Sequence, residues 1–371
     1  MKSLIISILC FISLTTHGQS ITYGPDILNT KDSSIVEVRN LWISYVTNCQ
    51  NGFDKTSKEY WNKYELEQGY TDIAKAAIGV PSYLFGEFKV LEIKRSDNEY
   101  FRIRSRMILG DSANMFIFTV FAKKVNNVFK LFNCFYIEKQ KLQHVQADNI
   151  DFYYPNSFSF NNQKAKQIVD NYAKISTLYG YMDKQRVTYI IGKNLYEANN
   201  FIGFEKTMYI SSQPAAAYTI KDQNIILSSR EDNLHELIHS IFMPMFPEAA
   251  ALFQEGIATY YGGSAGQNYS FLVDQLKNYI IKNPDINLSK FDDLNKVLDN
   301  GTNNFYTIGA IFINYAIKVG GTKKVLALFQ HPNTNEFTSA DAISAISKDL
   351  GIEKDQIDSF LKKYIQNYTA N

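Results

Sequence analysis

The sequence predicts an α+β protein built from two domains. A length of 371 residues suggests about two domains. Residues 87–137 alternate apolar and polar residues at the period of strands, whereas nearly all of the chain after Asn233 has apolar residues at helical spacing. Strands that precede a run of helices, instead of alternating with them, are typical of the α+β class.

The composition excludes several classes of protein. With 45% hydrophobic and 20% charged residues, the chain resembles folded proteins more than disordered ones. Its 38 Lys and Arg residues balance 37 Asp and Glu residues, so it lacks the basic excess that binding to nucleic acid or an acidic membrane requires. Three cysteines are too few for a disulfide-stapled scaffold. Cys49 and Cys134 either pair in an oxidising compartment or remain two buried thiols.

Residues 1–18 have the pattern of a secretory signal peptide. Lys2 precedes an apolar run from Leu4 to Leu14, and small and polar residues lead to a cleavage position after Gly18. The apolar run is shorter than the roughly 20 residues that a transmembrane helix needs. We therefore expect an exported protein without a transmembrane segment, either periplasmic or secreted.

Residues 19–150 predict an N-terminal domain of helices packed on an antiparallel sheet. A first helix is expected over residues 34–48, and a second helical segment within 56–78. Lys124–Asn127 suits a hairpin turn between the last two strands. The strands themselves are expected at residues 87–96, 99–109, 115–124 and 127–137. This order is similar in architecture to the NTF2-like fold, a likeness that implies no function.

Residues 151–371 form the second predicted domain. It is expected to begin with a helix over residues 161–178 and then to form a small sheet, before a long helical part that closes the chain. The strands of this sheet are expected at residues 187–191, 207–211, 216–220 and 224–228, and two amphipathic helices at 339–349 and 354–368.

The chemistry of the second domain centres on two of the chain's five histidines. His235, Glu236 and His239 form an H-E-x-x-H sequence on a predicted helix that is expected to end at Pro244. Residues four positions apart on a helix lie about 40° apart, so both imidazoles project from one face and can bind one metal ion. Glu236 is rotated by about 100° from His235, which leaves it available to take a proton from water. The alternative interpretation is two ordinary histidines on a half-buried helix face.

A third metal ligand is expected in the segment E-A-A-A-L-F-Q-E-G-I-A-T-Y-Y at residues 248–261. Pro247 suits the first turn of a helix, and a helix that returns after this proline would bring Glu255 beside the histidine pair. Glu248, which lies on nearly the same predicted face, is the competing ligand. We favour Glu255 because Gly256 allows close helix approach, and because a carboxylate at a helix start can serve simply to complement the helix dipole. Two histidines and one carboxylate leave the open position that a catalytic zinc site needs.

Three stretches together resemble the gluzincin clan of zinc metallopeptidases, and most closely the peptidase MA-like group related to the M1 aminopeptidases. They are H-E-L-I-H, F-Q-E-G-I-A-T-Y and Y-T-I-G-A-I-F-I-N-Y-A-I-K-V-G-G, all within residues 185–330. The resemblance implies a gluzincin-type metallopeptidase domain. It also implies one zinc ion bound by His235, His239 and Glu255, with Glu236 as general base and acid.

The resemblance implies two further features, and the sequence departs from the family pattern in two ways. It implies an edge strand that holds the substrate backbone, supplied by residues 216–220 or 224–228, and a tyrosine that stabilises the oxyanion, which Tyr306 matches by position. No G-A-M-E-N-like segment precedes the histidines, so the recognition of a free substrate amine has no visible counterpart. Thr259 stands where many relatives place an acidic residue behind a metal ligand, and Asp232 or another carboxylate is the candidate for orienting a ligand histidine.

The sequence therefore predicts an exported zinc-dependent metallopeptidase that acts on a peptide or protein substrate. Two alternatives remain open. One is an exported binding or assembly factor, in which the metal site is degenerate or structural and the N-terminal domain carries the function. The other is a zinc hydrolase that cleaves a bond other than a peptide bond.

Overall fold

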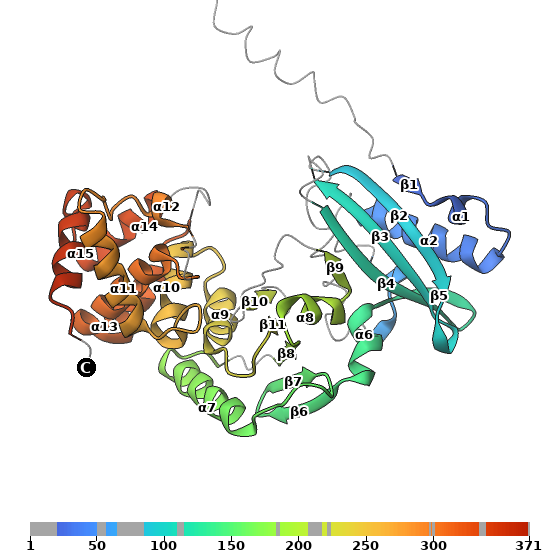
Figure 1. The fold of residues 1–371 in the computed structure, drawn as a ribbon, viewed down its shortest axis with the longest axis horizontal. Coiled ribbons are helices and arrows are strands. Elements are labelled where there is room, and N and C mark those ends of the chain that lie inside the picture. The colour runs from blue at the N-terminus through green and yellow to red at the C-terminus, as the bar shows by residue number, and fades with distance from the viewer. Residues whose placement is uncertain are drawn as a thin grey trace, which may run out of the picture. The chain divides into compact units, whose positions relative to one another are not determined.

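Figure 1 shows the protein as a computed structural model, which describes residues 21–49, 57–64, 85–109, 115–182, 186–206, 217–220, 224–296, 298, 301–333 and 339–369. The predicted signal peptide, the strand expected at 207–211 and most of the helical segment expected within 56–78 lie outside these residues. The side chain of Cys49 lies outside them as well. Cys134 is a buried thiol, and its Sγ donates a hydrogen bond to the carbonyl of Asn200 (3.7 Å).

The chain divides into two compact units. The first comprises the described residues within Met1–Gln140 and Asn199–Ile210, and the second comprises those within Lys141–Ala198 and Ser211–Asn371. The expected domain boundary after residue 150 therefore lies inside the second unit. The difference arises because residues 143–147 (QHVQA) form a largely exposed, polar strand, which lacks the apolar alternation that would have assigned it to a sheet.

The first unit contains helices and a six-stranded sheet, as expected for its α+β pattern. The strand order is β1-β2-β3-β4-β5, and β9, a strand that was not expected here, pairs with β4. All neighbours are antiparallel except β1 and β2. The elements are β1 (Ile21–Tyr23), α1 (Pro25–Leu28), α2 (Ser33–Cys49), α3 (Ser57–Tyr60), β2 (Phe85–Arg95), η3 (Asp97–Glu99), β3 (Phe101–Leu109), β4 (Met115–Val125), β5 (Val128–Asn133), α6 (Cys134–Glu138), η4 (Lys139–Lys141) and β9 (Phe204–Lys206).

The hairpin between β4 and β5 confirms the expected turn. Asn126 and Asn127 have φ values of 51° and 64°, the left-handed conformation that a two-residue hairpin turn requires. The strand expected to reach residue 137 was too long, because it ends at Asn133 and α6 follows. The pairing of β5 with β4 stops at Asn133, opposite Val120, and β9 pairs with the next part of β4, at Ile117 and Phe118.

The second unit begins with a five-stranded mixed sheet. Its order is β10-β11-β8-β7-β6, with β11, β8 and β7 parallel in the centre and an antiparallel strand at each edge. The helix expected over residues 161–178 is confirmed as α7, and Asn161 caps it by accepting from two backbone amides. The elements are β6 (Gln143–Ala147), β7 (Ile150–Tyr154), α7 (Asn162–Leu178), β8 (Val187–Ile191), α8 (Leu195–Phe201), which continues into the first unit, β10 (Ala217–Ile220) and β11 (Ile225–Ser228).

Helices form the rest of the second unit and enclose its apolar core. The apolar stripe of α9 is fully buried at four residues: Leu237, Ile238, Ile241 and Phe242. Within the described part of the chain, no helix is both long enough and apolar enough to cross a membrane. The elements are α9 (Leu234–Met245), α10 (Ala251–Gly262), α11 (Tyr269–Lys282), α12 (Phe291–Leu294), α13 (Asn304–Phe329), α14 (Ala340–Ala345), η6 (Ile346–Leu350), η7 (Lys354–Gln356) and α15 (Ile357–Gln366).

Two expected helix limits around the histidines were wrong. α9 continues through Pro244 to Met245, because a proline in the last turn removes one donor while Phe246 N still bonds to Phe242 O (2.9 Å). α10 begins at Ala251 and not near Pro247. The preceding segment forms a turn, in which the amide of Ala249 donates to the carbonyl of Phe246 (3.1 Å), and the carbonyl of Glu248 accepts from the amide of Asn333 (2.7 Å).

The crossing of α10 and α13 leaves no space for side chains at Gly256 and Gly309. A Cβ on Gly256 would lie 2.5 Å from the carbonyl carbon of Gly309, which confirms the close approach expected at this residue. Gly256→Ala should therefore lower the free energy of unfolding by about 2–3 kcal/mol, although alanine alone would favour an exposed helix by about 1 kcal/mol. Urea denaturation checks this, and a variant more stable than the wild type would contradict it.

Asp151 on β7 forms a polar network with Arg186 and His144. Its carboxylate accepts hydrogen bonds from Arg186 Nη2 (2.8 Å) and from His144 Nε2 (2.7 Å). Burial alone would raise the pKa of Asp151, but the hydrogen bonds and charges of Arg186 and His144 outweigh burial and lower it. The stabilisation is therefore present above the unfolded pKa of about 3.9 and is lost as the pH falls through the lower folded pKa.

Asp151→Asn tests this network. We expect the free energy of unfolding to fall by about 1–2 kcal/mol at pH 7, a modest value because both partners are partly exposed. The difference in the free energy of unfolding between this variant and the wild type should shrink at pH 3 and below. Denaturant midpoints at both pH values measure it, and an equal difference at both would contradict the assigned role of the charge.

Candidate metal centre

Three side chains of the second unit converge on one point. His235 and His239 project from α9, and Glu255 projects from α10. His235 Nε2 lies 3.2 Å from His239 Nε2 and 3.3 Å from Glu255 Oε2, and His239 Nε2 lies 3.6 Å from the same oxygen. Among the described residues, this is the group of histidine and acidic side chains that could share one metal ion. The ligands expected from the sequence therefore lie together.

Two consecutive glycines allow α10 to end against the start of α9. A Cβ on Gly262 would lie 2.3 Å from the backbone nitrogen of His235, so any side chain there would push the two helices apart. Gly263 follows with φ 74° and ψ −170°, a conformation that favours glycine. This turn places the carbonyl of Gly263 2.7 Å from His235 Nδ1.

The carbonyl of Gly263 determines which nitrogen of His235 faces the centre. Because a carbonyl only accepts, Nδ1–H of His235 donates to it, and Nε2 is the nitrogen that faces Glu255 and can bind a metal ion. No side-chain carboxylate is needed for this orientation. His239 is oriented differently, since its Nδ1 is buried and has no hydrogen-bond partner within the described ranges.

Charges within the group shift two pKa values in opposite directions. Burial disfavours the charged form of His235, but the hydrogen bond and charge of Glu255 outweigh burial and raise the pKa of His235. Burial would raise the pKa of Glu255, but the charge of His239 and the hydrogen bonds from both histidines lower it strongly. The group thus combines a carboxylate that stays ionised with two imidazoles that can exchange protons for a metal ion.

Glu236 lies beside this group without belonging to it. Its residue is 8% exposed, and its carboxylate accepts a hydrogen bond from the hydroxyl of Thr219 on β10, with Oγ1 2.7 Å from Oε2. The rotation of Glu236 away from the histidine face was expected from its position on the helix. A carboxylate held this way is available as a proton acceptor.

Tyr306 lies next to the candidate ligands. It occupies the first turn of α13, whose N-cap Asn303 accepts from Phe305 N. The Tyr306 and His235 rings lie 6.1 Å apart and nearly parallel, at 18°. Burial, followed by the charges of Glu255 and Glu236, raises the pKa of Tyr306. The phenol therefore stays protonated at neutral pH and can donate a hydrogen bond.

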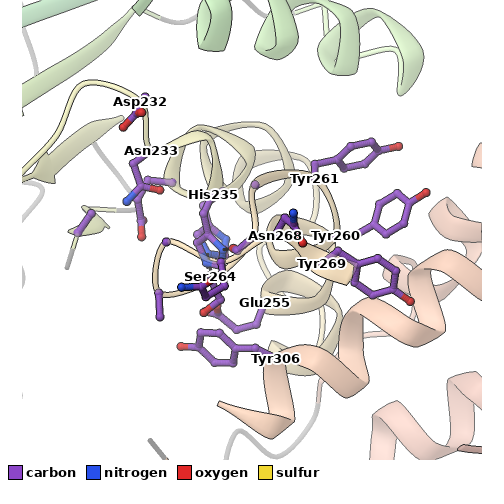
Figure 2. Close-up of a pocket in the computed structure, with 18 of the residues that line it drawn as sticks. Asp232, Asn233, His235, Glu255, Tyr260, Tyr261, Ser264, Asn268, Tyr269 and Tyr306 are labelled. Atoms are coloured by element: carbon purple, nitrogen blue, oxygen red, sulfur yellow. Dashed lines mark hydrogen bonds and ion pairs between the residues drawn. The ribbon is translucent and has the colours of Figure 1, made fainter. Parts of the chain in front are cut away.

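The candidate ligands open onto a cavity of about 920 Å³, and Figure 2 shows the side chains that line it. Tyr306 lies beside Glu255, while the rings of Tyr260 and Tyr261 point away from His235. The cavity is lined by residues of β10, α9, α10, the loop 263–268, and the starts of α11 and α13. Its size is within the range of about 300–1,000 Å³ that is typical of ligand sites.

Two residues considered from the sequence do not belong to the ligand group. Glu248, the competing ligand, is exposed and precedes α10, so it does not share a helix face with Glu255. Asp232 forms ion pairs with Arg230 and with Lys164 (3.3 Å), and not with a ligand histidine.

Two other residues at the site were not expected from the sequence. They are Thr219, which contacts Glu236, and Gly263, which orients His235. The only sequence signal for Gly263 is the Gly-Gly pair at the end of α10.

No protein-family model matches this chain, and no curated protein matches it either.

Proposed function

We propose that the protein is an exported zinc-dependent metallopeptidase that hydrolyses peptide bonds. The observation that carries this proposal is the convergence of His235, His239 and Glu255 beside Glu236, an acid that is not part of the ligand group. Three protein ligands leave one position open, as catalytic zinc sites require, whereas structural sites use four. The proposal agrees with the resemblance of the histidine and E-G-I-A-T-Y sequences to gluzincins.

The distances between the ligand atoms support zinc as the metal. Bonds of about 2.0–2.1 Å at tetrahedral angles place neighbouring ligand atoms about 3.3–3.4 Å apart. The three separations in the protein are 3.2, 3.3 and 3.6 Å. Zinc in such a site lowers the pKa of water toward about 7 and acts as a Lewis acid on a carbonyl.

The residues around the ligands supply the remaining parts of the reaction. Glu236 accepts a proton from the attacking water and returns it to the leaving amine. Tyr306 keeps its phenolic proton and donates a hydrogen bond to the oxygen that becomes negative. His235 is kept in one tautomer by the carbonyl of Gly263, so its Nε2 stays available as a ligand.

The edge of the small sheet offers a position for the substrate backbone. Among the described strands, β10 lies at an edge of the sheet, and Ala217, Tyr218 and Thr219 line the cavity. β11 is paired on both sides and has no open edge. Of the two strands considered, β10 is therefore the one that we propose pairs with an extended peptide, by the strand addition that many peptide-binding proteins use.

Digestion of a peptide library by the purified protein tests the proposal. We expect cleavage that a chelator abolishes and zinc restores, together with about one zinc per chain by elemental analysis. Chelator-sensitive hydrolysis of other bonds without peptide cleavage would favour a different zinc hydrolase. A protein that holds no zinc and cleaves nothing would favour the binding or assembly factor.

A further inference from the structure

The hydroxyl of Thr219 makes two contacts with Glu236. Thr219 Oγ1 lies 2.7 Å from Glu236 Oε2 and 3.2 Å from the backbone carbonyl of the same residue. A threonine hydroxyl carries one hydrogen, and the shorter contact identifies the carboxylate as its main acceptor. In the part of the chain that the structure describes, no other side chain forms a hydrogen bond with this carboxylate.

The hydroxyl of Thr219 reaches Glu236 from the edge strand β10. Thr219 pairs with Ile226 of β11, and the alternation of side chains along a strand places Tyr218 and Ile220 on the opposite face. Thr219 is therefore the residue of β10 whose side chain reaches the start of α9. Because threonine is branched at Cβ, its χ1 angle is restricted, which limits where the hydroxyl can point.

The contact gives the two oxygens of the largely buried Glu236 carboxylate different surroundings. Oε2 of Glu236 is held by Thr219, and the other oxygen is left for a different partner. A general base must present a lone pair to water within about 2.6–3.2 Å, so a carboxylate that rotates freely spends much of its time misdirected. A fixed Oε2 determines the direction of the second oxygen.

We infer that Thr219 is a positioning residue, which fixes the carboxylate of Glu236 through Oε2 so that its other oxygen faces the attacking water. This inference rests on the proposed function, in which Glu236 is the general base. Thr219 touches no reacting atom and acts only through Glu236. Since Thr219 lies on the strand proposed to pair with the substrate, one short element sets both the register of the peptide and the direction of the base.

Two substitutions at one position test this role. Thr219→Val keeps the shape of the side chain and removes the hydroxyl, whereas Thr219→Ser keeps the hydroxyl. We expect Thr219→Val to lower kcat by about 10–100-fold, as misplacement of a reacting group does, with KM within about twofold of the wild type. Thr219→Ser should stay within about fivefold of the wild-type kcat, because serine can make the same hydrogen bond. Both variants should retain about one zinc per chain.

The inference is overturned if Thr219→Val keeps a kcat within about twofold of the wild type, or if the serine variant is as slow as the valine variant. A second measurement needs no activity. In the full-length protein with chelator present, urea midpoints are compared for Thr219→Val, Glu236→Ala and the double variant. The loss caused by Thr219→Val should nearly vanish in the Glu236→Ala background, and an equal loss in both backgrounds would overturn the contact itself.

The two proposals fail in different ways. If the wild type cleaves no peptide while the midpoints show coupling, the peptidase proposal fails and the contact stands. If the wild type cleaves peptides and Glu236→Gln does not, but Thr219→Val is fully active, then only the role of Thr219 is wrong.

Discussion

Glu236→Gln is expected to abolish hydrolysis and to leave the metal bound. Glutamine has nearly the same shape, and its amide oxygen can still accept from Thr219, so the side chain should keep its place. What it loses is the ability to take a proton from water. General acid–base catalysis by one group contributes about 10²–10⁴-fold, and we expect kcat/KM to fall by at least about 10³-fold because Glu236 serves both the attack and the departure of the amine.

The comparison with Glu248→Gln makes this result specific. Glu248 is an exposed carboxylate of the same unit that lies outside the metal group, so its substitution should leave kcat/KM unchanged. Both variants should unfold at the wild-type temperature and contain as much zinc as the wild type. Full activity of Glu236→Gln would refute the mechanism, and loss of zinc from this variant would instead make Glu236 a metal ligand.

Features that depend on one short segment were predictable from the sequence. The strand at 187–191 and the helix α7 follow from apolar period alone, and the structure places them as expected. The pairing of His235 with His239 needs only the helical repeat. The choice of Glu255 over Glu248 required one further idea, that Gly256 marks a close helix crossing, and the crossing with Gly309 confirms it.

Features that depend on distant segments were not predictable in the same way. Thr219 meets Glu236 across 17 positions and His235 meets Gly263 across 28, and nothing local distinguishes this threonine from the others in the chain. The expected role of a carboxylate behind a ligand histidine is filled for His235 by a backbone carbonyl, which any residue type carries. Such contacts are set by how α9, α10 and β10 pack, and a pattern of residue types does not record that packing.

Glu255→Gln is expected to release the metal from a protein that remains folded. The carboxylate is the anionic member of the ligand group, and its strongly lowered pKa shows that two histidines already stabilise its charge. Loss of residues that merely support a ligand lowers metal affinity by about 10–100-fold, so loss of the ligand itself should exceed about 100-fold. Competition with a chromogenic chelator measures this affinity, and Glu248→Gln, at the competing site, should keep the wild-type value. The opposite pattern would exchange the roles of the two residues.

The pH dependence of the metal-free protein separates a lost ligand from a damaged fold. A raised pKa of His235 stabilises the folded state at pH values below its unfolded pKa of about 6.5, and this contribution disappears as the pH rises through the folded pKa. The contribution of Glu255 to the stability of the folded state is fully present above its unfolded pKa of about 4.3, and it is lost as the pH falls through its lowered folded pKa. Both contributions need the Glu255 charge, so Glu255→Gln should lower the free energy of unfolding most between about pH 4.5 and 6.5, and the loss should shrink as the pH rises through the raised folded pKa of His235. A loss of stability that does not change as the pH rises above about 6.5 would mean that Glu255 supports the packing of α10 and not the charge of the histidines.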